Sequence, residues 1–212
     1  MATTPSVTTV LLVRHGRTAS TGKILPGRAP GLHLSATGQR EASVAAQRIA
    51  ALSKSPAALY VSPLERTRET ARPIAAALGL RPRLTKGLLE CDFGDWTGRT
   101  LSSLRRLPEW RAVQNSPSTF RFPNGESFTE MQLRMWTTLE KIVLAHPNEM
   151  VVVVSHADPI KAAVTYAQGV PLDLFQRTVI STCSVSALAF TGSTPIVLSV
   201  NSTSSLQELT PS

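Results

Sequence analysis

The chain has 212 residues, 42% of them hydrophobic, which suffices for one substantial core. Its longest apolar run, MVVVV at 150–154, is far shorter than the roughly 20 residues that cross a bilayer as a helix, so no membrane span is expected. A formal charge of +8 favours anionic partners, namely nucleic acid, a membrane face or a phosphorylated small molecule. Because the arginines are spread along the chain, the charge argues only weakly for nucleic acid.

The beginning of the chain bears on its location. MATTPSVTTVLLVR has neither the basic start nor the cleavage pattern of a secretory signal. Two cysteines, Cys91 and Cys183, make no disulfide framework, and free thiols are their expected state. We therefore expect a cytoplasmic protein.

Strands and helices alternate in the first third of the chain. TTVLLV at 8–13 predicts a buried strand, because β-branched and aliphatic side chains suit a pleat covered on both faces. A helix follows the N-cap Ser35, with one apolar side formed by Val44, Ala45, Ile49 and Leu52. A second strand at 56–62 leads into a helix whose first turn holds Pro63 and which Gly79 terminates.

The middle of the chain is less regular. A short third strand is expected at 80–86, and the Gly-, Pro- and Trp-rich segment after it includes a lid-like stretch at 99–126. A strong helix then starts with a capping-box pattern at Ser127 and Glu130. Its core face is expected to comprise Phe128, Met131, Met135, Leu139 and Ile142.

The last part of the chain completes an α/β pattern. Its expected elements are a strand at 150–155, a helix at 159–168, and a hairpin of 185–190 and 196–200. Alternating strands and helices predict a sheet with helices on both faces, and the hairpin makes this sheet mixed. We expect one domain over 1–201 and a flexible tail at 202–212.

Two of the predicted strands end in histidine, at His15 in LLVRHG and at His156 in VVVVSHAD. In open α/β sheets the carboxyl ends of the strands face the ligand crevice, so both imidazoles are expected to meet there. A lone histidine at a strand end is more often structural. Two at equivalent positions, one between Arg14 and Arg17, favour a functional site.

Further cations and one carboxylate join this pair. Arg66 lies near the start of a helix whose positive N-terminus points at the crevice, whereas Arg68 and Arg72 are expected at the solvated surface. Glu90 follows two leucines that draw it into the core, where desolvation raises the pKa of a carboxyl group and suits it to general acid catalysis. Arginine forks match phosphoryl oxygens, and a neutral imidazole can attack phosphorus. The set therefore predicts phosphoryl transfer through a phosphohistidine.

The motifs that carry these residues occur in the order found in one family. They are RHGRT, GRAPGLHLSATGQREA, SPLERTRETA, LLECDFGDWTG, FPNGES and VVVVSHADPIKA. Over about residues 8–200 the chain resembles the histidine phosphatases, also called the phosphoglycerate mutase-like superfamily. The resemblance implies a three-layer α/β/α sandwich with a mostly parallel mixed sheet.

The resemblance also implies roles for individual residues. His15 would be the nucleophile, Glu90 the proton donor to the leaving oxygen, and His156 a catalytic partner within the phosphate pocket. The resemblance also implies that Arg14 and Arg66 bind the phosphate, and that Thr18 and Arg28 do so from the rim of the pocket.

This chain departs from the family pattern at three places. Thr21 stands where many members have asparagine, and it is expected to take over that phosphate contact. Ala157 replaces the usual glycine after the second histidine, and Asp158 follows it, either as a helix-start cap or as a competitor of Glu90 for proton donation. Arg17 stands where an acidic residue is common.

Three functions fit these motifs. Phosphatases and mutases share the chemistry and differ in which molecule accepts the phosphoryl group. Because cofactor-dependent mutases of the family carry longer lid and tail segments, we expect a metal-independent phosphomonoester hydrolase, with a phosphomutase of the phosphoglycerate mutase type as the alternative. A non-catalytic phospho-ligand-binding protein is a second alternative, against which the presence of His15 and Glu90 argues.

The expected partner is a small phosphorylated metabolite, first a phosphorylated sugar or carboxylic acid, with a nucleotide-like or cobalamin-pathway phosphate as alternatives. Four arginines of the lid-like stretch can meet a second anionic group: Arg105, Arg106, Arg111 and Arg121. Three aromatic residues can contact an apolar part of the substrate or pack in the core: Trp110, Phe120 and Phe122. No cofactor and no metal are expected, since His33 and His146 sit in no ligand spacing. Neither nucleic acid nor membrane is an expected partner, and we expect a monomer or homodimer.

Overall fold

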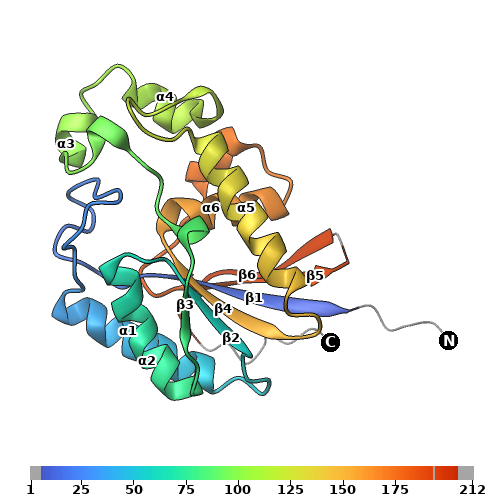
Figure 1. Ribbon diagram of the computed structural model, residues 1–212. Helices are drawn as coiled ribbons and strands as arrows, with labels where there is room; N and C mark the ends of the chain where they lie inside the picture. Colours follow the sequence, from blue (N-terminus) through green and yellow to red (C-terminus); the bar gives the residue numbers. More distant parts are fainter. Residues whose placement is uncertain (1–5, 193, 205–212) are drawn as a thin grey trace.

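A mixed sheet forms the centre of the computed structural model, which describes residues 6–192 and 194–204 (Figure 1). In spatial order its strands are β3 (Pro82–Leu84), β2 (Ala58–Val61), β4 (Met150–Ser155), β1 (Val7–Arg14), β5 (Val185–Thr191) and β6 (Thr194–Ser202). Strands β1 to β4 run parallel, whereas β5 is antiparallel to both β1 and β6. The predicted mostly parallel mixed sheet is confirmed.

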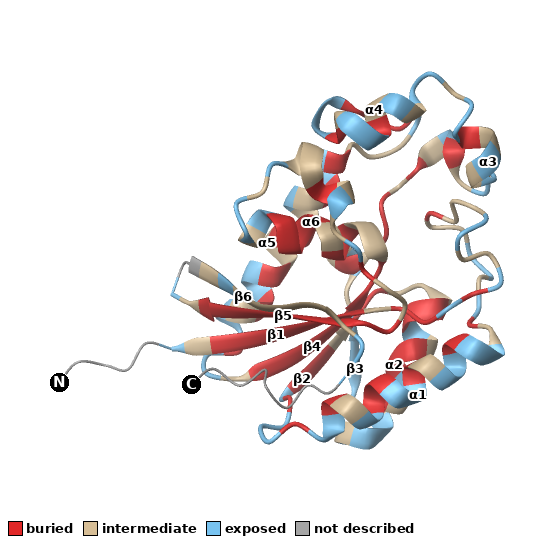
Figure 2. Cartoon of the chain, turned by 180° about the vertical axis from the view of Figure 1, so that it is seen from behind, coloured by how far each residue is buried: buried red, intermediate tan, exposed pale blue. Residues whose placement is uncertain are grey.

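Helices cover both faces of this sheet (Figure 2). One pair is α1 (Ala36–Ala50) and α2 (Glu65–Leu78), and the other is α5 (Phe128–Leu144) and α6 (Ala157–Ala167). Because successive side chains of a strand point to opposite faces, Val10 and Leu12 of β1 pack in the core under α5 and α6. Leu11 and Val13 pack under α1 and α2. The three-layer α/β/α sandwich is confirmed.

Short elements connect β3 to α5 and α6 to β5. They are the 3-10 helices η1 (Lys86–Leu88), η2 (Gly94–Trp96), η3 (Pro117–Thr119) and η4 (Leu172–Arg177) and the helices α3 (Leu101–Leu104) and α4 (Trp110–Asn115). We call residues 99–126, which contain α3, α4 and η3, the lobe. It lies away from the sheet, beyond α5 and α6, in the upper part of Figure 1.

Several predicted details of the elements are confirmed. The capping box of Ser127 and Glu130 is present at the start of α5. Its predicted core face is buried throughout, at Phe128, Met131, Met135, Leu139 and Ile142. Gly79 ends α2 in the left-handed conformation, with φ of 65°. Within the described residues, no helix has the length and apolarity that crossing a bilayer requires.

Other details are wrong. Val44 is 52% exposed, because it lies two residues or roughly 200° around α1 from the buried Ala42 and Ala46. Helix α2 begins at Glu65 rather than at Pro63, since Leu64 is still extended and serves as its N-cap. The third strand is shorter than expected, and α6 starts directly after His156. Of the expected tail, 205–212 lie outside the described residues, and Ser202 belongs to β6.

Candidate active site

The two strand-end histidines meet at the carboxyl ends of β1 and β4. These strands are parallel neighbours, with Arg14 in register with Ser155, so the residues that follow them lie side by side. The His15 amide donates to the Ser155 carbonyl at 3.0 Å. The ring centroids of His15 and His156 are 5.2 Å apart, in an edge-to-face arrangement.

Two hydrogen bonds define which nitrogen of His15 carries the proton. Its Nδ1 lies 2.8 Å from the Gly16 carbonyl oxygen, which can only accept, so Nδ1 is the protonated nitrogen. Arg66 donates from Nε to His15 Nε2 at 3.3 Å, consistent with a lone pair there. Burial, followed by the charges of Arg66 and Arg14, holds the pKa of His15 well below its usual value. The ring is therefore neutral, with Nε2 as its basic atom.

The turn that holds His15 is fixed by close contact with both helices of one layer. The Gly16 amide donates to Thr70 Oγ1 of α2 at 3.0 Å. On the other side, the first turn of α1 presses on the backbone, because a Cβ on Gly38 would lie 2.0 Å from the Arg17 carbonyl oxygen. Glycine is thus required at position 38, and the imidazole sits on a rigid support.

Two arginines lie close to His15, and each has a buried N–H donor without a partner among the described residues. Arg66 is completely buried and donates from Nη2 to the Gly27 carbonyl at 2.8 Å, which leaves Nη1 unpartnered. Arg14 donates from Nη1 to the Ile180 carbonyl at 2.6 Å, and its Nε is unpartnered. Because an unsatisfied buried donor costs about 1–3 kcal/mol, these groups fit a site that receives an anion.

His156 completes the set from the end of β4. Its Nε2 is 2.7 Å from Ser62 Oγ, at the end of β2, and its Nδ1 is buried without a partner in the described part of the chain. When the Ser62 hydroxyl donates to Nε2, Nδ1 becomes a further donor for an anion. Burial and the charge of Arg66 lower the pKa of His156 well below its usual value.

Glu90 is the buried acid of the site. Its exposed fraction is 7%, and the Cys91 amide donates to its Oε1 at 2.9 Å. Burial and then the charge of Asp158 raise the pKa of Glu90 to about 7, against the opposing influence of Arg66. A carboxyl group with this pKa can give and take a proton at neutral pH. Asp158 itself faces Lys161 at 3.5 Å in the first turn of α6.

A cavity of about 370 Å³ opens above these groups. Of the residues predicted for the site, its lining includes Arg14, His15, Thr18, Thr21 and Glu90. Arg66 and His156 are fully buried, with Arg66 in contact with His15 and His156 against its ring.

Thr21 does not simply present its hydroxyl to the cavity. Its Oγ1 accepts from the Thr18 amide at 2.9 Å and lies 3.0 Å from Thr18 Oγ1. The hydroxyl that stands in the asparagine position therefore shapes its own turn while it lines the cavity.

Comparison with known proteins now identifies the family. The model of the histidine phosphatase superfamily (branch 1) matches residues 10–203. The chain belongs to this superfamily. Phosphoserine phosphatase 1 of Hydrogenobacter thermophilus is 31% identical over 204 residues, which cover 94% of both proteins.

Two further similarities complete the comparison. A protein of Erwinia tasmaniensis named "Probable phosphoglycerate mutase GpmB" is 32% identical over 180 residues, which cover 84% of this chain and 82% of the relative. Among solved structures, Bacillus stearothermophilus YhfR superposes with a TM-score of 0.85 at 25% identity, covering 96% of this chain and all of the other.

One residue that the family resemblance assigned to the pocket rim has other partners. Arg28 donates from Nε to the Glu90 carbonyl at 2.9 Å and from Nη2 to Glu126 Oε2 at 2.9 Å, and its Nη1 lies 3.3 Å from Asp92. It is not among the residues that line the cavity. Its guanidinium therefore lies against the main chain of Glu90, and its role at the pocket rim stays a prediction.

Sequence reasoning missed several residues of this histidine phosphatase that hold the site. They are Ser62 and Thr70, described above, together with Glu126 and Arg134. The motif FPNGES contains Glu126 and was a visible signal without an assigned role. Arg134 stands beside the core positions of α5, where a cation needs an internal partner.

The lobe contributes a second part of the cavity. A space of about 360 Å³ continues the first and shares Leu25, Phe93, Leu101, Asp158, Lys161 and Gln176 with it. Arg105, Trp110 and Phe122 of the lobe line this part.

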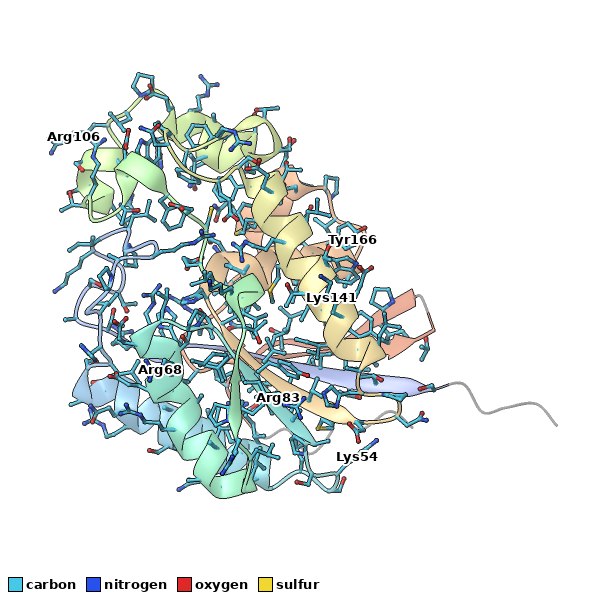
Figure 3. All side chains as sticks on the ribbon, viewed as in Figure 1. Lys54, Arg68, Arg83, Arg106, Lys141 and Tyr166 are labelled. Carbon is cyan, nitrogen blue, oxygen red and sulfur yellow. The ribbon has the colours of Figure 1, made fainter. Side chains whose placement is uncertain are left out.

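The other lobe residues considered above lie elsewhere. Phe120 packs against Trp96 with ring centroids 5.4 Å apart. Arg121 pairs with Glu130 of α5. Arg106 and Arg111 are exposed, and in Figure 3 Arg106 extends outward beside α3. Of the four arginines, Arg105 is the one that reaches the lining.

Proposed function

We propose that this histidine phosphatase hydrolyses phosphomonoesters of small metabolites through a phosphohistidine at His15. One observation carries the proposal: His15 is held neutral with its Nδ1 proton bound to a carbonyl, and Nε2 adjoins the guanidinium of Arg66. A basic imidazole nitrogen beside fixed cations suits attack on a phosphoryl group. In this proposal Arg14 and Arg66 neutralise the phosphoryl oxygens, the neutral His156 donates a hydrogen bond to them from Nδ1, and Thr18 and Thr21 line the edge of the pocket.

The proposed reaction has two steps. His15 Nε2 attacks phosphorus, the P–N bond forms, the ester P–O bond breaks, and protonated Glu90 gives its proton to the leaving oxygen. Water then attacks the phosphohistidine, Glu90 accepts a proton from that water, and the P–N bond breaks to release phosphate. The pKa of Glu90 near 7 suits it to both roles. The guanidinium groups supply the positive charge, and no metal ion takes part.

The substrate proposal follows from the walls of the cavity. Apolar residues Ile24, Leu25, Phe93 and Leu101 line it together with the polar Lys161 and Gln176. A leaving group with an apolar portion and a hydrogen-bonding acceptor fits such a wall. Among the expected classes this favours a phosphorylated carboxylic acid over a sugar that is polar all round.

Phosphomutase activity is the second candidate, because one relative carries a phosphoglycerate mutase name. The two reactions share the first step and differ in the acceptor of the phosphoryl group. We favour hydrolysis, since a relative that covers 94% of both chains carries a phosphatase name. We further propose a cytoplasmic location, a monomer or homodimer, and no nucleic-acid or membrane partner.

The test is a panel of phosphorylated carboxylic acids and sugars incubated with the protein in the presence of EDTA. Free phosphate and isomerised product are both measured, and acid-labile, base-stable phosphoprotein is trapped by rapid quenching. We expect phosphate release and a trapped phosphoprotein that His15→Ala does not form. Formation of the isomerised product without release of free phosphate would identify the protein as a phosphomutase instead of a phosphatase. If neither product forms with any substrate, the proposed catalytic function fails and the non-catalytic phospho-ligand-binding alternative is the one that is left.

A further inference from the structure

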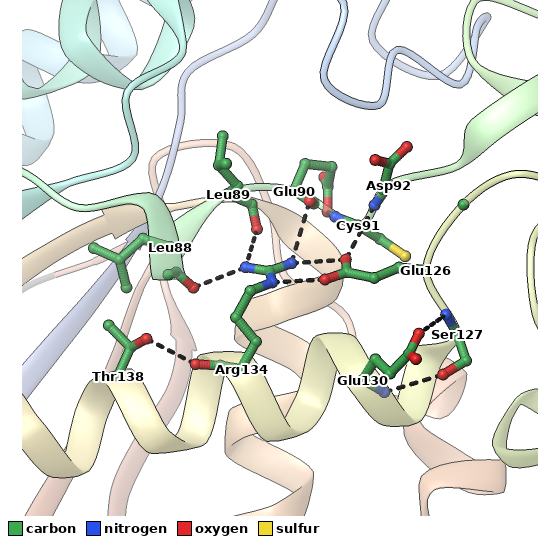
Figure 4. A network of polar contacts seen from close by, with 12 residues as sticks. Leu88, Leu89, Glu90, Cys91, Asp92, Glu126, Ser127, Glu130, Arg134 and Thr138 are labelled. Atoms are coloured by element: carbon green, nitrogen blue, oxygen red, sulfur yellow. Dashed lines mark hydrogen bonds and ion pairs between the residues drawn. The ribbon is translucent and has the colours of Figure 1, made fainter.

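Behind Glu90, one arginine of α5 uses three of its five N–H donors on the segment that carries this acid and the other two on Glu126 (Figure 4). Arg134 donates from Nη1 to the carbonyls of Gly87 and Leu89, at 2.8 and 3.0 Å. Its Nη2 donates to the Glu90 carbonyl at 3.3 Å. The remaining donors bind Glu126, from Nε at 2.7 Å and from Nη2 at 2.9 Å. The guanidinium therefore has no donor left for a substrate.

Glu126 joins this arginine to a second one. Its carboxylate also accepts from Arg28 Nη2 at 2.9 Å and from the Asp92 amide at 3.1 Å. Burial raises the pKa of Glu126, but the hydrogen bond and charge of Arg134 outweigh it, so the pKa lies below its usual value and the group is ionised. Arg28 and Arg134, which share this carboxylate, also both donate to the main-chain carbonyl of Glu90.

The backbone of the same segment is also pressed against α5. A Cβ on Gly87 would lie 1.9 Å from Thr138 Oγ1, one turn along the helix from Arg134. The carboxyl group of Glu90, by contrast, receives a hydrogen bond from the next residue in the chain, the Cys91 amide. Its position in the cavity is thus set by how its backbone is held. Proton transfer depends steeply on such positioning.

We propose that Arg134, held by Glu126, is a positioning residue for Glu90 in proton donation. This inference rests on the function proposed above. Arg134 is not among the residues that line the cavity and reaches it only through the main chain of Glu90, so its removal displaces the acid without removing a phosphate contact. The steps that suffer are the two proton transfers assigned to Glu90, to the leaving oxygen and from the attacking water, and attack by His15 is spared.

Arg134→Lys is the decisive variant, because lysine keeps the charge facing Glu126 but lacks the planar fork that reaches several carbonyls. Two substrates of similar size separate the steps: phenyl phosphate, whose leaving group has a pKa of about 10 and needs a proton, and p-nitrophenyl phosphate, whose leaving group is far more acidic. We expect kcat/KM for phenyl phosphate, which covers the steps up to departure of the leaving group, to fall about tenfold, part of the roughly 10²–10⁴-fold that general acid catalysis contributes. For p-nitrophenyl phosphate we expect kcat/KM to fall less than about threefold, whereas hydrolysis of the phosphohistidine is common to both substrates and enters only kcat.

A matched control exists on the far side of the sheet. Arg48 of α1 also donates from its guanidinium to main-chain oxygen, at 3.0 Å from Ser202, and Arg48→Lys is expected to leave both rates unchanged. Should Arg134→Lys fail to fold, Glu126→Gln tests the same anchor, with the same direction expected.

The outcomes separate this inference from the proposed function. An equal loss for both substrates would give Arg134 a purely structural role, and no loss for either would also overturn the inference. If the unaltered protein hydrolyses neither substrate and His15→Ala changes nothing, the proposed function itself fails.

Discussion

The site at the carboxyl ends of the strands and the lobe are held in place by different kinds of contact. His15, His156 and Ser62 follow three adjacent strands, and the ladder hydrogen bonds of the sheet place them. The lobe has short helices held by aromatic contacts, such as Phe120 and Phe122 with ring centroids 5.0 Å apart, and four of its arginines are exposed, namely Arg105, Arg106, Arg111 and Arg121. Under the proposed function, the rigid centre would carry the chemistry, and the lobe, whose loops are less constrained, would select the leaving group.

The largest effect is expected at the centre of the rigid part. His15→Ala removes the proposed nucleophile, and we expect kcat to fall by at least about a thousandfold with little change in unfolding temperature. His33→Ala is the matched control, because His33 is an exposed histidine that pairs with Glu69. Turnover at the normal rate in His15→Ala would place the nucleophile elsewhere.

Arg66→Lys tests whether the geometry of the cation matters as well as its charge. The lysine ammonium cannot hold the Gly27 carbonyl, the His15 ring and a phosphoryl oxygen together. We expect kcat/KM to fall about 10²–10³-fold, as for loss of one fixed donor to a developing charge. Arg68→Lys, on the exposed side of the same helix in Figure 3, is the control. Equal effects in the two variants would contradict the comparison.

Glu90, which lines the cavity beside His15, gives a prediction on pH. Its raised pKa of about 7 means that the protonated form is lost as pH rises through 7. For phenyl phosphate, kcat/KM of the unaltered protein should therefore decline above about pH 7, whereas p-nitrophenyl phosphate should show no such decline.

Glu90→Gln should slow phenyl phosphate about a hundredfold, within the usual range for general acid catalysis, and abolish its alkaline decline. The measurement is kcat/KM for the two substrates at matched pH, because hydrolysis of the phosphohistidine, in which Glu90 acts as base, is common to both and enters only kcat. Equal losses for both would assign Glu90 a positional role and turn attention to Asp158.

The rigid part was also the part that could be predicted from sequence. Strands β1 and β4 are buried on both faces and therefore read as continuous apolar runs, and their ends locate His15 and His156. The capping box likewise identifies the start of α5. Val44 was misplaced because α1 is rich in alanine, and its buried face has little hydrophobic contrast with the exposed one.

The partners of Arg28 and Arg134 could not be predicted in this way. Both arginines bind main-chain carbonyls near Glu90 that are more than 40 residues away in sequence, as the Arg28 to Glu90 separation of 62 illustrates. A carbonyl carries no side-chain identity, so no motif reveals which one a guanidinium will reach. The family pattern placed Arg28 near the site but did not indicate that its guanidinium binds the main-chain carbonyl of Glu90.

The smallest expected effect tests the lobe. Arg105 lines the outer part of the cavity, and its neighbour Arg106 points to solvent. Arg105→Ala should raise KM about two- to fivefold for a phosphorylated carboxylic acid, as expected for an exposed charge, with kcat unchanged. Arg106→Ala should alter neither, and phenyl phosphate, which has no second anionic group, should not distinguish the variants. If Arg105→Ala lowers kcat instead, the lobe takes part in the chemical step and the division between the two regions is wrong.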